Sequence, residues 1–265
     1  MSKLEGHVAV ITGASKGLGQ QMAEALARAG AAVALVARTQ DLLESVADGI
    51  RASGGRAEVI VADITEEAGV DRVARQVKST LGVCDILINN AGINIRKNVE
   101  DFSLGEWNQI VGVNLTGPFL TCRAFVPGMK EKGWGRIINM TSIMSHVSIP
   151  QRIGYSSTKF GLLGMVKALA LELAPHSITV NGISPGPFGT EMNQPIMNDP
   201  ALNQQFVSRI PLGRWGEIEE IGALAVFLSS DDAGFISGTD KPRGGDDLQA
   251  QRRSAGPDPL ALAGS

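Results

Sequence analysis

The chain has 265 residues, and its 24 Lys and Arg residues nearly balance 27 Asp and Glu residues, for a formal net charge of −3. This balance argues against a dedicated nucleic-acid binder, which usually carries a strongly basic surface, and the 43% of hydrophobic residues argues against whole-chain disorder. Because aromatic residues make up only 5% and glycines number 32, the composition favours helices packed on a parallel sheet over an aromatic-rich β-sandwich.

Short apolar runs alternate along the chain with segments of helical pattern. The runs predict strands at residues 7–12, 32–37, 58–62, 86–89, 136–140 and 178–183. The helical patterns predict helices at residues 18–29, 42–52, 70–81, 104–117 and 156–174. This alternation predicts an α/β fold, a single-domain Rossmann-type doubly wound parallel sheet with helices on both faces.

Signals for metals, disulfides and membranes are weak in this sequence. Cys84 and Cys122 make neither a disulfide framework nor a spaced metal site, and the three histidines are scattered, so we predict no metal. The N-terminus has no apolar signal region, and no apolar run approaches the ~20 residues that span a bilayer. We therefore expect a cytoplasmic protein that binds neither nucleic acid nor membrane.

A glycine-rich turn at residues 12–19 joins the first strand to the first helix. Glycines let the backbone turn sharply and let a pyrophosphate approach, while the helix N-terminus offers free N–H groups to phosphates. The glycine spacing is wider than G-x-G-x-x-G, which indicates a variant of the dinucleotide fingerprint; the alternative is a tight turn without a ligand. The candidate cofactor-binding residues here are Gly13, Ser15, Lys16, Gly17, Leu18 and Gly19.

The end of the second strand points to the type of dinucleotide. Folds that bind NAD usually place Asp or Glu here, on the ribose 2′-hydroxyl, but this chain has Arg38 and no acid. Arg38 is suited to a 2′-phosphate, and Lys16 adds a second positive charge. We therefore expect NADP rather than NAD, the alternative being that both residues are ordinary surface cations.

Two further motifs point to proton transfer. Tyr155 and Lys159 are four residues apart, on one face of a predicted helix, and the ammonium is expected to lower the pKa of the phenol. Tyr155 would then donate a proton to a carbonyl or accept one from an alcohol. Ser142 follows the fifth strand, where ligands of open α/β sheets bind. The alternatives are a surface Tyr above a solvated Lys and a serine that serves only the turn.

Taken together, these motifs closely resemble the short-chain dehydrogenase/reductase family over residues 3–239. The ordered set that carries the resemblance is Thr12-Gly13-x-x-x-Gly17-x-Gly19, Asp63, Asn89-Asn90-Ala91-Gly92, Asn114, Ser142, Tyr155-x-x-x-Lys159 and Pro185-Gly186. The resemblance implies an enzyme that transfers a hydride between a nicotinamide and a secondary alcohol or ketone.

The resemblance also implies a role for each matched residue. Ser142 would position the substrate carbonyl, Tyr155 would act as general acid/base, Lys159 would bind the nicotinamide ribose, and Asn114 would hold a water of a proton relay. The remaining cofactor contacts would come from Asp63, Ile64, Asn90, Ala91, Gly92, Pro185, Gly186 and Thr190.

Substrate identity follows less directly. Residues 93–97, 140–146 and 211–216 look most like gluconate 5-dehydrogenases, which interconvert a sugar acid and its keto form with NADP, and residues 189–216 occupy the place of a substrate lid. Arg96 is the first candidate to bind the carboxylate; Arg152 and His146 are weaker candidates for the same pocket. The alternatives are a 3-oxoacyl-thioester reductase or broad carbonyl reductase of the same family, and a non-catalytic dinucleotide-sensing module.

The sequence departs from the family near its C-terminus. Lys241, Pro242 and Arg243 replace residues that suit a buried final strand, and a low-complexity stretch follows. We interpret residues 1–240 as the dinucleotide-binding and catalytic domain, and residues 241–265 as an atypical, disordered tail such as a reading-frame change would produce. We still expect a homo-oligomer, a tetramer or dimer, formed through the helices at residues 104–117 and 156–174.

Overall fold

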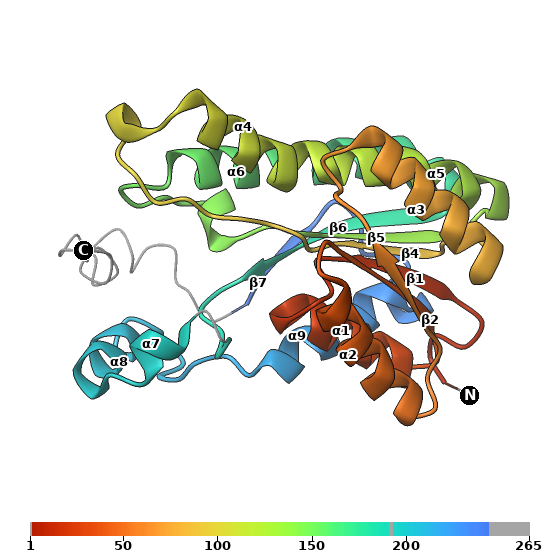
Figure 1. Ribbon diagram of the computed structural model, residues 1–265, viewed down its shortest axis with the longest axis horizontal. Helices are drawn as coiled ribbons and strands as arrows, with labels where there is room; N and C mark the ends of the chain where they lie inside the picture. Colours follow the sequence, from red (N-terminus) through yellow and green to blue (C-terminus); the bar gives the residue numbers. More distant parts are fainter. Residues whose placement is uncertain (1, 191–192, 244–265) are drawn as a thin grey trace.

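Seven parallel strands form one sheet at the centre of the computed structural model, which describes residues 2–190 and 193–243, the last three by their backbone alone (Figure 1). The strand order is β3-β2-β1-β4-β5-β6-β7. The strands are β1 (Val8–Thr12), β2 (Ala32–Ala37), β3 (Ala57–Val61), β4 (Ile86–Asn89), β5 (Gly135–Met140), β6 (Ile178–Pro185) and β7 (Asp240–Arg243). The predicted doubly wound fold is confirmed.

Helices cover both faces of the sheet. In Figure 1, α3 to α6 lie on one side, and α1, α2 and α9 lie on the other. Their bounds are α1 (Gly17–Arg28), α2 (Gln40–Ala52), α3 (Glu67–Thr80), α4 (Leu104–Val111), α5 (Gly117–Lys132), α6 (Ile153–Leu173) and α9 (Ile218–Ser229).

Alternation along the central strands divides the core into two layers. On β4, Ile86 and Ile88 pack in the layer under α1, α2 and α9, whereas Leu87 packs in the layer under α3, α5 and α6. All three side chains are fully buried. Successive side chains of a strand point to opposite faces, so a strand covered on both faces is apolar throughout, as the sequence predicted.

The long helix predicted from residue 104 is interrupted by a wider turn. The segment η2 (Gly112–Thr116) is a π-helix between α4 and α5. Single π turns inside α-helices frequently mark functional sites. Asn114 lies in this turn and is fully buried.

The strand β7 was not expected from its sequence. It pairs in parallel with the C-terminal half of β6, with Gly182 opposite Asp240 and Ser184 opposite Pro242. Proline is tolerated there because β7 is the last strand of the sheet, where one side of the backbone needs no ladder partner. The sheet therefore runs three residues past the predicted domain boundary; the rest of the predicted tail lies outside the described residues.

The segment predicted as a lid includes two short helices, α7 (Gln194–Met197) and α8 (Pro200–Val207), which project from one end of the molecule (Figure 1). Trp215 stacks on Phe206 with ring centroids 4.6 Å apart and donates to Asn203 Oδ1 at 2.7 Å. A bridge between Phe188 and Gly216 closes the base of the segment.

Candidate active site

The sequence-predicted site residues follow the carboxyl ends of the strands. Because all the strands are parallel, these ends meet at one edge of the sheet. The chain order reverses between β1 and β4, and open α/β sheets bind ligands at such a reversal. The glycine turn follows β1, Arg38 follows β2, and Asp63 and Ile64 follow β3. Asn90 to Gly92 follow β4, and Ser142 follows β5. The strand β6 ends at Pro185 and is followed by Gly186 and Thr190.

Hydrogen bonds tie the glycine turn to the end of β4. The Asn90 side chain donates to the carbonyl oxygens of Thr12 and Gly13, both at 3.0 Å. The Thr12 hydroxyl accepts from the backbone N–H groups of Asn90 and Ala91 at 3.0 and 3.1 Å. A Cβ at Gly19 would lie 2.2 Å from the Gly13 oxygen, so this close packing requires glycine.

The first turn of α1 fits a phosphate. No side chain caps the helix at its N-cap residue, Lys16, so the N–H groups of the first turn are available. Gly17 has a φ of +59°, and a Cβ there would meet nothing within 4 Å. Open space above a positive helix end is what a pyrophosphate group needs, and the residues present therefore fit a dinucleotide.

Arg38 extends from the end of β2 toward Asp63. Its Nη1 lies 3.9 Å from Asp63 Oδ2, and 68% of its side chain is exposed. Partial burial raises the pKa of Asp63, but hydrogen bonds from Thr65 and the charge of Arg38 outweigh it and hold the pKa below its ordinary value. Ile64 instead packs inward on the start of α5, where a Cβ at Gly117 would lie 2.6 Å from Ile64 Cδ1.

Ser142 and Tyr155 are brought together at the end of β5. Ser142 caps the short turn η3 (Ile143–Ser145): its hydroxyl accepts from Met144 N at 3.1 Å, and its own N–H donates to Ser145 Oγ at 3.2 Å. Tyr155 lies in the first turn of α6, and its phenol is hydrogen-bonded with Ser142. Ser142 is buried, and Tyr155 is half-buried.

The prediction that the pKa of Tyr155 falls is wrong. Burial raises the pKa of Tyr155, although the hydrogen bond with Ser142 and the positive charge of Arg152 both lower it. Lys159 Nζ lies 5.6 Å from the centre of the Tyr155 ring and donates to the carbonyl oxygen of Met140 at 2.5 Å. Its ammonium is thus directed at the backbone of β5, and the phenol is protonated at neutral pH.

The pKa of Lys159 is shifted as well. Burial lowers its pKa to about 8, against the attraction of Asp240, which raises it. A Cβ at Gly92 would lie 3.7 Å from Lys159 Nζ and 3.4 Å from Asn114 Oδ1, so the loop after β4 passes close to both buried polar groups at Gly92.

Asn114 anchors that loop. Its Oδ1 accepts from Ile93 N at 2.8 Å, and its Nδ2 donates to Ile93 O at 2.9 Å and to Thr158 Oγ1 at 3.2 Å. The π turn therefore places a side chain that binds the loop after β4 on one side and α6 on the other.

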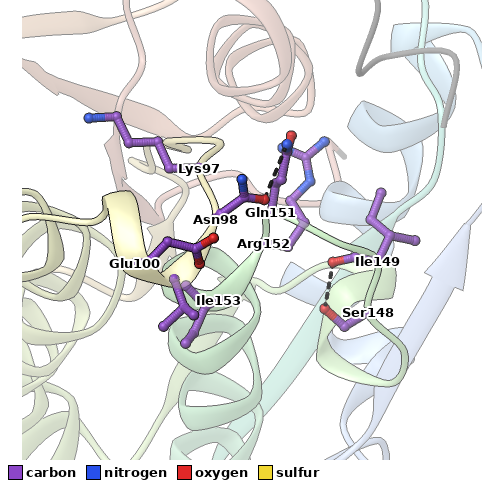
Figure 2. Close-up of a pocket in the computed structure, with 9 residues that line it drawn as sticks. Lys97, Asn98, Glu100, Ser148, Ile149, Gln151, Arg152 and Ile153 are labelled. Atoms are coloured by element: carbon purple, nitrogen blue, oxygen red, sulfur yellow. Dashed lines mark hydrogen bonds between the residues drawn. The ribbon is translucent and has the colours of Figure 1, made fainter.

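A pocket of about 390 Å³ lies between the loop after β4 and the start of α6 (Figure 2). Its polar groups come from both segments, and Gln151 Nε2 donates to Asn98 Oδ1 at 3.5 Å across it. The Arg152 side chain is buried, and its charge acts on Tyr155. The lining residues are Lys97, Asn98, Val99, Glu100, Ser148, Ile149, Gln151, Arg152 and Ile153.

The three predicted substrate residues have different surroundings. Arg152 lines the pocket. Arg96 is exposed on the loop after β4 and is not among the lining residues. His146 is paired with Asp240, its Nε2 2.7 Å from Oδ2. Sequence reasoning missed Asp240, because nothing in the sequence marks a pairing over 94 residues.

Within the described residues, no group of three or more His, Cys, Asp or Glu side chains has the arrangement of a metal site. In the same part of the chain, no helix has both the length and the apolar character needed to cross a membrane.

Comparisons with known proteins agree with this geometry. The profile of the enoyl-(acyl carrier protein) reductase family matches residues 13–242. The gluconate 5-dehydrogenase of Gluconobacter oxydans is 36% identical over 235 residues, 89% of this chain and 92% of that protein. The acetoacetyl-CoA reductase of Rhizobium meliloti is 40% identical over 234 residues, 88% of this chain and 95% of that protein.

Solved structures give the same result. A gluconate 5-dehydrogenase from Burkholderia cenocepacia, in complex with NADP and tartrate, has a TM-score of 0.86 and 34% identity. The match covers 92% of this chain and 95% of that one.

The chain therefore belongs to the short-chain dehydrogenase/reductase family. Its relatives are named dehydrogenases and reductases, and the protein is an oxidoreductase that acts on alcohol and ketone groups. The structures of relatives with bound NADP support a nicotinamide dinucleotide as its cofactor.

Proposed function

We propose that this protein is an NADP-dependent oxidoreductase that interconverts the secondary alcohol and the ketone of a sugar acid, as a gluconate 5-dehydrogenase does. The observation that carries the reaction is the contact between Ser142 and Tyr155, with Lys159 beside the phenol ring. When bound, the nicotinamide supplies or accepts a hydride at the substrate carbon.

Residues of the chain itself transfer the proton. Ser142 donates a hydrogen bond to the substrate oxygen, and Tyr155, protonated at neutral pH, gives its proton to that oxygen as the ketone becomes an alcohol. The Lys159 ammonium binds the nicotinamide ribose, and the positive charge of Arg152 favours the phenolate that Tyr155 leaves behind. Because the Asn114 side chain is engaged with Ile93 and Thr158, a water of the proton relay would bind the Asn114 backbone carbonyl.

NADP is favoured over NAD by two cations at the edge of the site. Arg38 is mostly exposed after β2, and Lys16 is exposed at the N-cap of α1. A guanidinium suits a 2′-phosphate, and no carboxylate follows β2 directly to bind a free 2′-hydroxyl. The residues that would hold the dinucleotide are Gly13, Ser15, Lys16, Gly17, Leu18, Gly19, Arg38, Asp63, Ile64, Asn90, Ala91, Gly92, Tyr155, Lys159, Pro185, Gly186 and Thr190.

A sugar acid suits the pocket at the start of α6, which is lined by Arg152, three residues before Tyr155. The side chains of Asn98, Ser148 and Gln151 supply hydrogen-bonding groups for hydroxyls, and the buried Arg152 supplies a positive charge for a carboxylate (Figure 2). Arg96, on the same loop as Asn98, is the second candidate for the carboxylate. Relatives named gluconate 5-dehydrogenase, one of them with bound tartrate, support this substrate class.

The second candidate function is reduction of a 3-oxoacyl thioester, because the acetoacetyl-CoA reductase is 40% identical to this chain. A panel of keto-sugar acids, acyl thioesters and simple ketones, assayed with NADPH and NADH by cofactor absorbance, decides between them. We expect the highest kcat/KM with a keto-sugar acid and NADPH. A higher kcat/KM with a thioester would refute the sugar-acid assignment.

Tyr155→Phe is the matched control for the panel. Because it removes only the proton donor, it is expected to lower kcat by at least about 100-fold while dinucleotide affinity changes little. Near-normal turnover in this variant would contradict the proton-transfer role. Dinucleotide binding by the wild type without turnover of any substrate would favour the sensing module instead.

We also propose a cytoplasmic homo-oligomer, a tetramer or dimer. Large apolar side chains are exposed on three of the helices that cover one face of the sheet: Leu104 on α4, Phe119 on α5, and Phe160 and Leu171 on α6. Leu171 is 81% exposed, which is costly unless another subunit covers it. Light scattering at micromolar concentration tests this proposal, and a monomer alone would refute it.

A further inference from the structure

A buried carboxylate lies behind the catalytic serine. The Asp240 side chain is 4% exposed. Its Oδ1 accepts from the Thr141 hydroxyl at 2.7 Å, and its Oδ2 accepts from the Ser184 hydroxyl at 2.6 Å and lies 2.7 Å from His146 Nε2. A buried charge is tolerated only when it is paired and hydrogen-bonded in this way.

The fold leaves room for this carboxylate. Gly182 of β6 lies opposite Asp240 in the register of the two strands. A Cβ at Gly182 would lie 2.5 Å from Asp240 Oδ1, so a side chain there would displace the carboxylate. The niche is thus built from a glycine and a serine on β6 and from polar groups of the segment that follows β5.

Each partner of Asp240 holds the segment that carries Ser142, residues 141–146. Thr141 directly precedes Ser142, and the Ser184 hydroxyl lies 3.1 Å from the Ser142 carbonyl oxygen. His146 ends the turn that Ser142 caps, and its N–H donates to Ile143 O at 3.0 Å. Asp240 therefore fixes both ends of the segment from a strand far away in sequence.

The same carboxylate is linked to the catalytic lysine: Lys159 donates to the carbonyl oxygen of Met140, and the hydroxyl of the next residue, Thr141, donates to Asp240. Lys159 is buried, and Asp240 is the charged group that opposes the effect of burial on its pKa. The other titratable or charged groups around this centre are Tyr155 on α6, Arg152 before it, and His146 on the far side of the carboxylate.

We propose that Asp240 is a positioning residue, which holds the Ser142 segment in its catalytic conformation and keeps a negative charge facing the Lys159 ammonium. This proposal rests on the proposed function, in which Ser142 and Lys159 are catalytic residues. Asp240 acts through Ser142 and Lys159, and so it controls both the group that orients the substrate oxygen and the charge beside the phenol.

The primary test is Asp240→Asn, which keeps the size of the side chain and removes its charge. Hydrogen exchange is measured for the backbone amides of residues 141–147, relative to those of β1, and the Lys159 titration is followed by lysine side-chain NMR, assigned with Lys159→Arg. We expect exchange in the segment to rise about tenfold, as loss of a charge-assisted hydrogen bond predicts. The Lys159 midpoint should fall by about 1 in pH, since an opposite charge has been removed.

Asp85→Asn is the matched control. Asp85 is also a buried carboxylate, beside His7 and bonded to Val8 N at 2.9 Å, but it directly precedes β4, at the opposite edge of the sheet. This variant should destabilise the protein without moving the Lys159 midpoint and without raising exchange in the Ser142 segment relative to β2, the reference for this variant because Asp85 binds the Val8 amide of β1. Equal effects of the two variants would overturn the proposal.

His146 gives a second test if Asp240→Asn fails to fold. The His146 side chain is 26% exposed, so its replacement is tolerated more easily. His146→Ala should raise exchange in the Ser142 segment, and His146→Gln, whose amide can donate to Asp240, should restore protection. Unchanged exchange in His146→Ala would count against the proposal.

With the substrate that the panel identifies, Asp240→Asn should lower kcat about tenfold. The alkaline limb of its pH profile should move to lower pH, as the Lys159 midpoint does. An inactive wild type would refute the proposed function alone, because exchange and NMR need no substrate. An unchanged exchange pattern and an unchanged Lys159 midpoint would overturn the role of Asp240 even if the wild type is active.

Discussion

Replacement of Lys159 by methionine should stabilise the protein. Lys159 is 4% exposed, and burial lowers its pKa from the ordinary value of 10.5 to about 8. One pKa unit corresponds to about 1.4 kcal/mol, so keeping this lysine charged at neutral pH costs the folded state about 3 kcal/mol. Methionine has a similar length and no charge, but it leaves the Met140 carbonyl without the ammonium donor, which costs about 1 kcal/mol.

The net gain is therefore about 2 kcal/mol at pH 7. For a chain of this size it corresponds to a rise in Tm of about 5 °C. The pH dependence follows from proton binding. Between pH 8 and 10.5 the unfolded chain holds the Lys159 proton and the folded chain does not, so the contribution of Lys159 to the free energy of unfolding of the wild type rises with pH. The advantage of Lys159→Met should shrink across that range and be lost near pH 10, where the remaining charge penalty equals the cost at the Met140 carbonyl.

Denaturant unfolding and thermal scans at pH 7 and pH 10, at one protein concentration and without dinucleotide, measure this difference. Lys167→Met, an exposed lysine on the same helix, is the matched control and should change stability little at either pH. The reasoning is refuted if Lys159→Met is no more stable than the wild type at pH 7, or if its advantage is the same at both pH values. The gain in stability should accompany a large loss of turnover, as is common at catalytic sites.

Three other predictions concern single charges. Arg38→Asp should shift the ratio of kcat/KM values for NADPH and NADH toward NADH by about 100-fold, because a carboxylate repels the 2′-phosphate; an unchanged ratio would exclude Arg38 as the phosphate contact. Arg152→Gln should raise KM for keto-sugar acids about tenfold more than for neutral ketones, and the same comparison with Arg96→Ala identifies which arginine binds the carboxylate. Burial raises the pKa of Asp85, but the neighbouring His7 and the hydrogen bonds from Lys132 and Val8 N together outweigh it and hold the pKa below its ordinary value; Asp85→Asn should therefore cost about 2 kcal/mol at pH 7, and this difference should disappear as the pH falls below the ordinary aspartate value of 3.8 in urea unfolding experiments.

The order of strands and helices could be predicted because each is a local pattern. Apolar runs such as residues 32–37 and 86–89 are covered on both faces in the structure. Alternate residues of each run pack in opposite layers of the core. The glycine turn and the Tyr155-x-x-x-Lys159 spacing are equally local, so the sequence located these groups at the carboxyl edge of the sheet.

The features that could not be predicted from the sequence depend on contacts between residues that are far apart in the chain. The strand β7 forms because β6 offers an open edge, which overrides the poor strand preference of its residues. The direction of the Tyr155 pKa depends on burial by the whole site, whereas the spacing shows only that Lys159 is near. The pairing of His146, a weaker candidate for the substrate carboxylate, with Asp240 joins residues that are 94 positions apart in sequence.

The π turn at Gly112–Thr116 holds one residue more than a regular helical turn. A one-residue deletion there would return the helix to regular winding and leave the buried face of α5, which includes Leu120, Phe125 and Met129, against the sheet. The deletion would instead remove or shift Asn114 and its bonds to Ile93 and Thr158. The extra residue is thus dispensable for folding and needed for the site, and a library of single-residue deletions should contain folded members from this segment that have lost turnover.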